Sequence, residues 1–188
     1  PSAPSDSPRP TADLVGPEDP SAGDSGPLRL LLVEDNPGDA RLLEEYLSEA
    51  SRLSAGLARA GSLSEALDRL RNGSPEPDAV LLDLNLPDAD GLETVHRMID
   101  AAPDLPVIVL TGLDDREMAL AAVREGAQDY LLKGEVDGEL LARSLRYALE
   151  RKRSERQVAR FAEELEEERA RLEEVFREAP AFLAVLRG

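Results

Sequence analysis

Residues 28–132 alternate short, continuous apolar runs with amphipathic segments, and this alternation leaves few folds open. The runs are LRLLLV (28–33), the weaker GLARA (56–60), AVLL (79–82), VIVL (107–110) and YLL (130–132). Four of them are continuous, as is typical of strands buried on both faces. Five strands that alternate with five helices predict an α/β fold, in which a parallel sheet carries helices on both faces.

Capping residues mark the expected ends of several helices between these runs. Asn36 is a common N-cap residue, and Pro37 follows it at an expected first helical position. Ser62 and Glu65 have the spacing of a capping box. Gly126 follows the amphipathic stretch DREMALAAVRE and predicts a helix C-terminus there.

A long helix is predicted from residue 138 to about residue 179. A stripe near its start has the spacing to pack on the sheet: Leu140, Leu141, Leu145 and Ala148. A second stripe follows the a and d positions of a heptad repeat: Val158, Phe161, Leu165, Leu172 and Val175. We call this second stripe the seam; Glu168 interrupts it. The seam predicts that residues 151–179 form a dimeric coiled coil. Because the stretch is densely charged, a single solvated helix is the alternative.

The composition excludes several classes of site. The chain has 188 residues and no cysteine, so disulfides and cysteine-based zinc sites are ruled out. A formal net charge of −17 argues against a nucleic-acid-binding surface. No apolar run approaches the roughly 20 residues that span a bilayer, and the Pro-, Ser- and Asp-rich start shows no signal peptide. We expect a cytoplasmic protein without a membrane partner, with a disordered low-complexity segment at residues 1–27.

Polar side chains stand where the predicted strands end. They are Glu34, Asp35, Asp83, Thr111 and Lys133. Parallel strands end at one edge of a sheet, which is where open α/β sheets bind their ligands. Converging carboxylates repel one another, and Mg²⁺ resolves that repulsion with the oxygen ligands it prefers. A lysine and a hydroxyl beside the metal suit a phosphoryl group, and Asp83 is the best candidate for its nucleophile.

These residues lie in four motifs that resemble the receiver domain of two-component response regulators, over residues 28–150. The motifs are LLVEDNPGDA, AVLLDLNLPDADGLE, VIVLTG and DYLLK. The resemblance implies a flavodoxin-like, doubly wound, five-stranded parallel sheet of order 2-1-3-4-5. It also implies that Asp83 accepts a phosphoryl group from a histidine kinase or phosphotransfer protein. Mg²⁺ would be bound by Asp35, Asp83 and the backbone carbonyl of Asn85, with Glu34 acting through water.

The resemblance also assigns roles to three further residues. Thr111 would bind a phosphoryl oxygen through its hydroxyl, and Lys133 would pair with another. Tyr130 matches the switch aromatic, which turns inward when Thr111 moves. The family usually has a proline after the lysine, whereas this chain has Gly134, and glycine does not enforce one backbone conformation.

The end of the chain, VFREAPAFLAVLRG, resembles the opening of the PAS sensory domains that follow receivers in some sensor kinases. Residues 180–188 would then be the truncated start of such a domain; the alternative is a helix end with a frayed apolar tail. We expect a phosphoacceptor signalling domain rather than an enzyme, one that acts on a downstream module through a dimeric helix. Two alternatives are a receiver-like dimerisation scaffold that is not phosphorylated and a phosphatase that uses an aspartyl phosphate. Asn85 argues against the phosphatase, because such enzymes typically have a second acid there.

Overall fold

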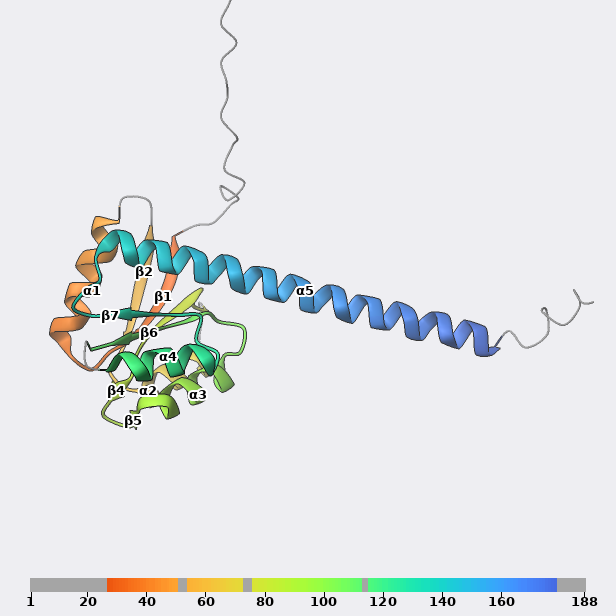
Figure 1. Ribbon diagram of the computed structural model, residues 1–188, viewed down its shortest axis with the longest axis horizontal. Helices are drawn as coiled ribbons and strands as arrows, with labels where there is room; N and C mark the ends of the chain where they lie inside the picture. The colour runs from red at the N-terminus through yellow and green to blue at the C-terminus, as the bar shows by residue number, and fades with distance from the viewer. Residues whose placement is uncertain (1–26, 51–53, 73–75, 113–114, 179–188) are drawn as a thin grey trace, which may run out of the picture.

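A five-stranded parallel sheet forms the centre of the protein (Figure 1). The computed structural model describes residues 27–50, 54–72, 76–112 and 115–178. The sheet strands are β1 (Leu28–Val33), β2 (Ala55–Ala60), β3 (Ala79–Asp83), β6 (Val107–Thr111) and β7 (Asp129–Leu132). Their order is β2-β1-β3-β6-β7, which differs from the predicted 2-1-3-4-5 only in numbering. Two short strands, β4 (Asn85–Leu86) and β5 (Ala89–Asp90), form a separate antiparallel hairpin and take two numbers.

Burial along the strands explains why one run was weak in the sequence. Every residue of β3 and β6 is buried, because both strands lie inside the sheet and are covered on both faces. Strand β2 lies at the edge of the sheet, and all of its residues except Ala60 are exposed or half-buried. An edge strand needs less apolar surface than a central one, so β2 has glycine, alanine and arginine around a single leucine.

In the described part of the chain, five helices cover the two faces of the sheet, as predicted. They are α1 (Pro37–Glu49), α2 (Leu63–Asn72), α3 (Gly91–Ala101), α4 (Arg116–Arg124) and α5 (Gly138–Glu178). Helices α1 and α5 pack on one face, and α2, α3 and α4 pack on the other (Figure 1). Leu43 of α1 and Leu141 of α5 belong to the first core, whereas Leu67 of α2 and Val95 of α3 belong to the second.

The predicted ends of α1 and α4 are confirmed. The side chain of Asn36 accepts a hydrogen bond of 2.8 Å from the backbone N–H of Gly38, and Pro37 begins α1. Gly126 follows α4 with a φ of 112°, a left-handed conformation that L side chains rarely adopt. These signals are local in sequence, which is why they could be interpreted without the structure.

The start of α2 is capped from a distant part of the chain. Asp88, in the turn between β4 and β5, accepts hydrogen bonds from the backbone N–H groups of Leu63 (2.9 Å) and Ser64 (2.8 Å). It also accepts one from the Ser64 hydroxyl (2.6 Å). The predicted capping box is formed in part: the Ser62 hydroxyl accepts from the N–H of Glu65, but the Glu65 carboxylate accepts from residue 61 instead of Ser62. Asp88 therefore ties the hairpin to α2.

Replacement of Asp88 with alanine should lower the free energy of unfolding by about 1–2 kcal/mol, because the first N–H groups of α2 lose their acceptor. Urea denaturation followed by circular dichroism measures the change. Asp100→Ala, at an exposed position on α3, is the control and should change it by less than about 0.5 kcal/mol. Equal effects of the two substitutions would contradict a specific capping role.

The first turn of α5 approaches the end of α1 very closely. A Cβ atom added to Gly138 would lie 2.6 Å from the backbone oxygen of Tyr46. Real Cβ contacts are not that short, so any larger residue forces the two helices apart. Glycine at this position lets α5 turn back over the sheet directly after β7.

Gly138→Ala should therefore lower the free energy of unfolding by about 1–3 kcal/mol, since a packed helix contact must open. Thermal unfolding measures it. Gly56→Ala is the matched control, because a Cβ there meets only ordinary contacts, 3.9 Å from the backbone oxygen of Leu28. The control should be neutral or slightly stabilising; a comparable loss in both variants would show that the close approach is not the cause.

Helix α5 continues well beyond the sheet (Figure 1). Polar contacts hold it where it leaves the domain: Arg156 forms an ion pair of 3.5 Å with Asp104 and also donates to its backbone oxygen. Gln128 donates to Glu155 across 3.5 Å. The seam begins directly after these contacts, and its five residues are 50–71% exposed.

Two predicted segments lie outside the described residues. Residues 1–26 of the expected disordered segment and the tail at residues 180–188 belong to them. Within the described ranges, none of the helices is both long enough and apolar enough to cross a membrane.

Candidate functional site

The carboxyl ends of β1 and β3 bring together the acidic residues that the sequence singled out. One carboxylate oxygen from each of Glu34, Asp35 and Asp83 lies within 4.8 Å of the others. Glu34 is fully buried and Asp83 is 4% exposed, whereas Asp35 faces solvent. We call these three residues the acidic cluster. Adjacent parallel strands place their ends side by side, so the fold itself causes this convergence.

Lys133 follows β7 and reaches into the acidic cluster. Its ammonium nitrogen lies 2.7 Å from Glu34 Oε2 and 3.0 Å from Asp83 Oδ2. A third carboxylate, that of Asp39 in the first turn of α1, lies 2.9 Å away. Lys133, expected from the sequence to pair with a phosphoryl oxygen, thus also offsets the negative charge of the carboxylates themselves. Asp39 was missed from the sequence, because its place near the end of β7 depends on the start angle of α1.

For both Glu34 and Lys133, burial shifts the pKa in one direction and the neighbouring opposite charge shifts it in the other. Burial raises the pKa of Glu34, and the adjacent ammonium of Lys133 offsets only part of that rise. Burial lowers the pKa of Lys133, but the adjacent carboxylates of Glu34, Asp39 and Asp83 outweigh it, so the pKa lies above its usual value. Lys133 therefore stays charged throughout the neutral range.

Thr111, the last residue of β6, is fully buried. Its hydroxyl oxygen has no hydrogen-bond partner among the described residues. Its backbone oxygen accepts from the N–H of Lys133 across 2.9 Å, so the two residues share one end of the sheet. A buried hydroxyl without a partner is unusual, and a ligand oxygen would satisfy it.

The other two predicted site residues lie on neighbouring elements. Asn85 begins β4, two residues after Asp83, with an exposed side chain. Tyr130 lies in β7, paired with Val109, and its half-buried ring packs against the core beneath α2, α3 and α4.

The donor atoms of the acidic cluster fit a hard divalent cation. All are carboxylate oxygens at the carboxyl end of the sheet, and such oxygens are the ligands that Mg²⁺ takes from proteins. Asp35 is open to solvent, which leaves room for the water ligands that Mg²⁺ retains.

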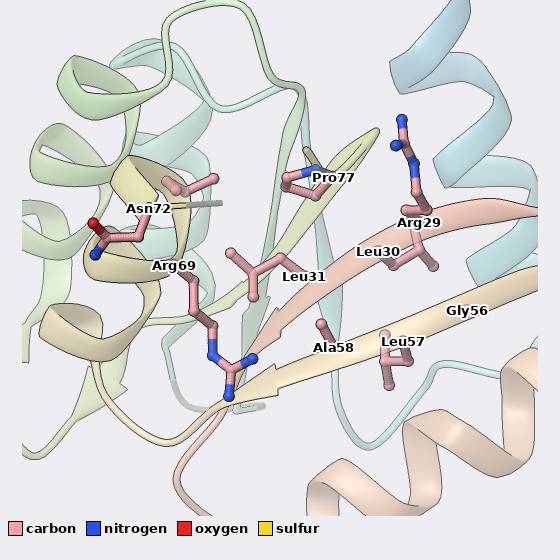
Figure 2. A pocket seen from close by; sticks show the side chains of 10 residues that line it. Arg29, Leu30, Leu31, Gly56, Leu57, Ala58, Arg69, Asn72 and Pro77 are labelled. Carbon is pink, nitrogen blue, oxygen red and sulfur yellow. The ribbon is translucent and has the colours of Figure 1, made fainter. Parts of the chain in front are cut away.

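A hollow of about 480 Å³ lies elsewhere, between β1, β2 and the end of α2 (Figure 2). Gly56 and Ala58 of β2 are among its lining residues, and neither has a large side chain to fill it. Its lining contains leucines and two arginines but none of the acidic cluster. It is therefore separate from the site at the carboxyl ends of the strands.

Comparison with known proteins shows which family this arrangement represents. The profile described as "Response regulator receiver domain" matches residues 30–146. Among curated proteins, Response regulator MprA from Mycobacterium sp. (strain KMS) is 40% identical over 117 residues, covering 62% of this chain and 49% of MprA. Regulatory protein LuxO from Vibrio cholerae is 34% identical over 102 residues, 54% of this chain and 21% of LuxO. The chain thus spans about half the length of MprA, and less of LuxO.

Solved structures agree with this result. The signal receiver domain of an HD domain-containing protein from Pseudomonas fluorescens has a TM-score of 0.61 and 32% identity, covering 72% of this chain and 96% of that one. A response regulator structure from Chloroflexus aurantiacus has a TM-score of 0.57 and 32% identity, covering 65% of this chain and 98% of that one. The chain belongs to the response regulator receiver domain family of two-component systems.

Proposed function

We propose that Asp83 is the phosphoacceptor of this receiver and takes its phosphoryl group from a histidine kinase or a phosphotransfer protein. The contact of 3.0 Å between Lys133 Nζ and Asp83 Oδ2 carries the proposal. In the reaction, the bond between phosphorus and a histidine nitrogen breaks, and a bond between phosphorus and an Asp83 carboxylate oxygen forms. The cationic amine is placed to neutralise charge on the transferred group.

The residues around Asp83 have two further roles in this proposal: some would bind Mg²⁺, and others would donate to the phosphoryl oxygens. Asp35, Asp83 and the backbone carbonyl of Asn85 would hold Mg²⁺, with Glu34 acting through water. When bound, Mg²⁺ supplies the positive charge that offsets carboxylate and phosphoryl oxygens. The unpartnered hydroxyl of Thr111 is the donor for one phosphoryl oxygen, and Lys133 is the donor for another.

The output passes from β7 to α5 in this proposal. Thr111 moves towards the phosphoryl group, and Tyr130 turns into the space beside it. The neighbouring Asp129 accepts a hydrogen bond of 2.6 Å from the hydroxyl of Ser144 on α5, and Ser144 is buried. A shift of β7 therefore acts on α5 through a direct contact.

Residues 28–150 act as the receiver and residues 151–179 as a signalling helix in this proposal. The helix pairs with a second copy along the seam. The support is the exposure of the seam residues, because a helix with an uncovered apolar stripe is stabilised by a partner. A downstream module in a longer protein would receive the change in the pairing.

Intact mass spectrometry after incubation with acetyl phosphate and Mg²⁺ tests the proposal. We expect the wild type to gain one phosphoryl group and Asp83→Asn to gain none. Thermal unfolding with and without Mg²⁺ shows in parallel whether the cation binds, because a ligand of the native state raises its stability. No phosphoryl gain together with no Mg²⁺ effect would contradict the proposal and favour a dimerisation scaffold that is not phosphorylated.

A further inference from the structure

Asp39 contacts the amine that the proposed reaction depends on, although the sequence motifs gave it no role. Its carboxylate Oδ2 lies 2.9 Å from Lys133 Nζ. It extends from the first turn of α1, which the Asn36 cap and Pro37 fix at the carboxyl end of β1. Its side chain is 38% exposed, in contrast to Glu34 at 0% and Asp83 at 5%.

Three carboxylates surround the ammonium group of Lys133. It donates hydrogen bonds to Asp39 (2.9 Å) and Asp83 (3.0 Å), and Glu34 Oε2 lies 2.7 Å away as an ion pair without hydrogen-bond geometry. A phosphoryl oxygen on Asp83 that attracts the ammonium therefore competes with these carboxylates for it.

The exposure of the partners decides which one leaves. Glu34 is fully buried and lies nearest to the ammonium, so its contact is the most costly of the three to break. Asp83 itself bears the phosphoryl group. Asp39 remains, and water can hydrate its half-exposed carboxylate once the ammonium departs.

We infer that Asp39 is a positioning residue, which holds Lys133 while Asp83 is free and competes with the phosphoryl group for it. This inference rests on the proposed function and adds a regulatory element to the same site. Removing the negative charge of Asp39 should strengthen binding of a phosphoryl group at Asp83, because Lys133 is released and one repulsive charge is lost.

The beryllium fluoride anion BeF₃⁻, a non-covalent phosphoryl analogue, gives a direct test at saturating Mg²⁺. Fluorine NMR measures its bound fraction. Asp39→Asn should lower the dissociation constant by roughly three- to tenfold, whereas Asp39→Glu, which retains the charge, should stay within about twofold of the wild type. The difference in dissociation constant between Asp39→Asn and the wild type should shrink at about 0.5 M salt, because Asp39 is partly exposed and salt screens its charge. A loss of packing alone would produce neither the rescue nor the salt dependence.

Two controls separate the possible failures. Glu44→Gln removes the same charge from an exposed position on α1, about a turn and a half from Asp39, and should leave the affinity unchanged. Asp83→Asn should not bind the anion. If the wild type binds, Asp83→Asn does not, and Asp39→Asn binds no more tightly than the wild type, this inference alone is overturned. If the wild type also fails to bind, the proposed function and the inference fall together.

Discussion

Replacement of Lys133 with alanine should lower the free energy of unfolding by about 2–4 kcal/mol in metal-free buffer. The variant leaves three carboxylates without their common cation, and one of them, Glu34, is fully buried. The folded pKa of Lys133 is raised, so its stabilising contribution is fully present below its ordinary pKa and is lost only as the pH rises through the folded value. On the acid side the deficit should narrow as the pH falls through the raised pKa of Glu34, because protonation removes the unpaired charge.

Urea denaturation at several pH values measures this effect. Arg160→Ala removes a positive charge from an ion pair on the exposed part of α5, where its side chain is 80% exposed. This control should change the free energy of unfolding by less than about 1 kcal/mol. Saturating Mg²⁺ should restore part of the stability of Lys133→Ala, since a cation can replace the lost charge. If Lys133→Ala lowers the free energy of unfolding no more than Arg160→Ala does, the fold does not need Lys133 to offset the acidic cluster.

The second large effect is expected in the assembly of the protein. Leu165→Glu should weaken self-association roughly 100-fold, because it places a charge at the centre of the seam. Leu165 is 71% exposed in the single chain, so the substitution should leave the receiver folded. Sedimentation equilibrium of the complete chain measures the dissociation constant.

The control for the seam is Ala170→Glu. Ala170 is also exposed on α5, but it lies at an outer position of the heptad repeat, away from the seam. It adds the same charge to the same helix and should leave the dimer intact. A wild-type protein that remains monomeric at high concentration would reject the coiled coil in favour of a single solvated helix.

The sequence was sufficient for features that depend on neighbouring residues. Continuous apolar runs located β3 and β6, and the alternation with amphipathic stretches predicted the parallel sheet and its covering helices. The convergence of Glu34 and Asp83 followed from the geometry of parallel strands, without knowledge of any contact. These features could be predicted because burial and strand direction are repeated along several residues.

Contacts between segments that are distant in sequence could not be derived in the same way. The β4–β5 hairpin has two residues in each strand, too few to show a periodic pattern. Asp88 reaches α2 only because that hairpin turns beside it, and Asp39 reaches Lys133 only because α1 starts at a particular angle. Such contacts depend on the packing of whole elements, for which a single sequence has no local signal.

The unbroken helix α5 has a mechanical consequence. Among the described residues, its outermost polar contacts with the domain are those of Glu155 and Arg156, at the end of the sheet opposite the acidic cluster, and the helix continues to residue 178. At 1.5 Å per residue, this free arm is about 30 Å long. A tilt of about 5° at Arg156 would displace its tip by about 3 Å, roughly half of one helical turn. A small tilt where α5 leaves the domain would therefore arrive at its far end as a displacement of about half a helical turn.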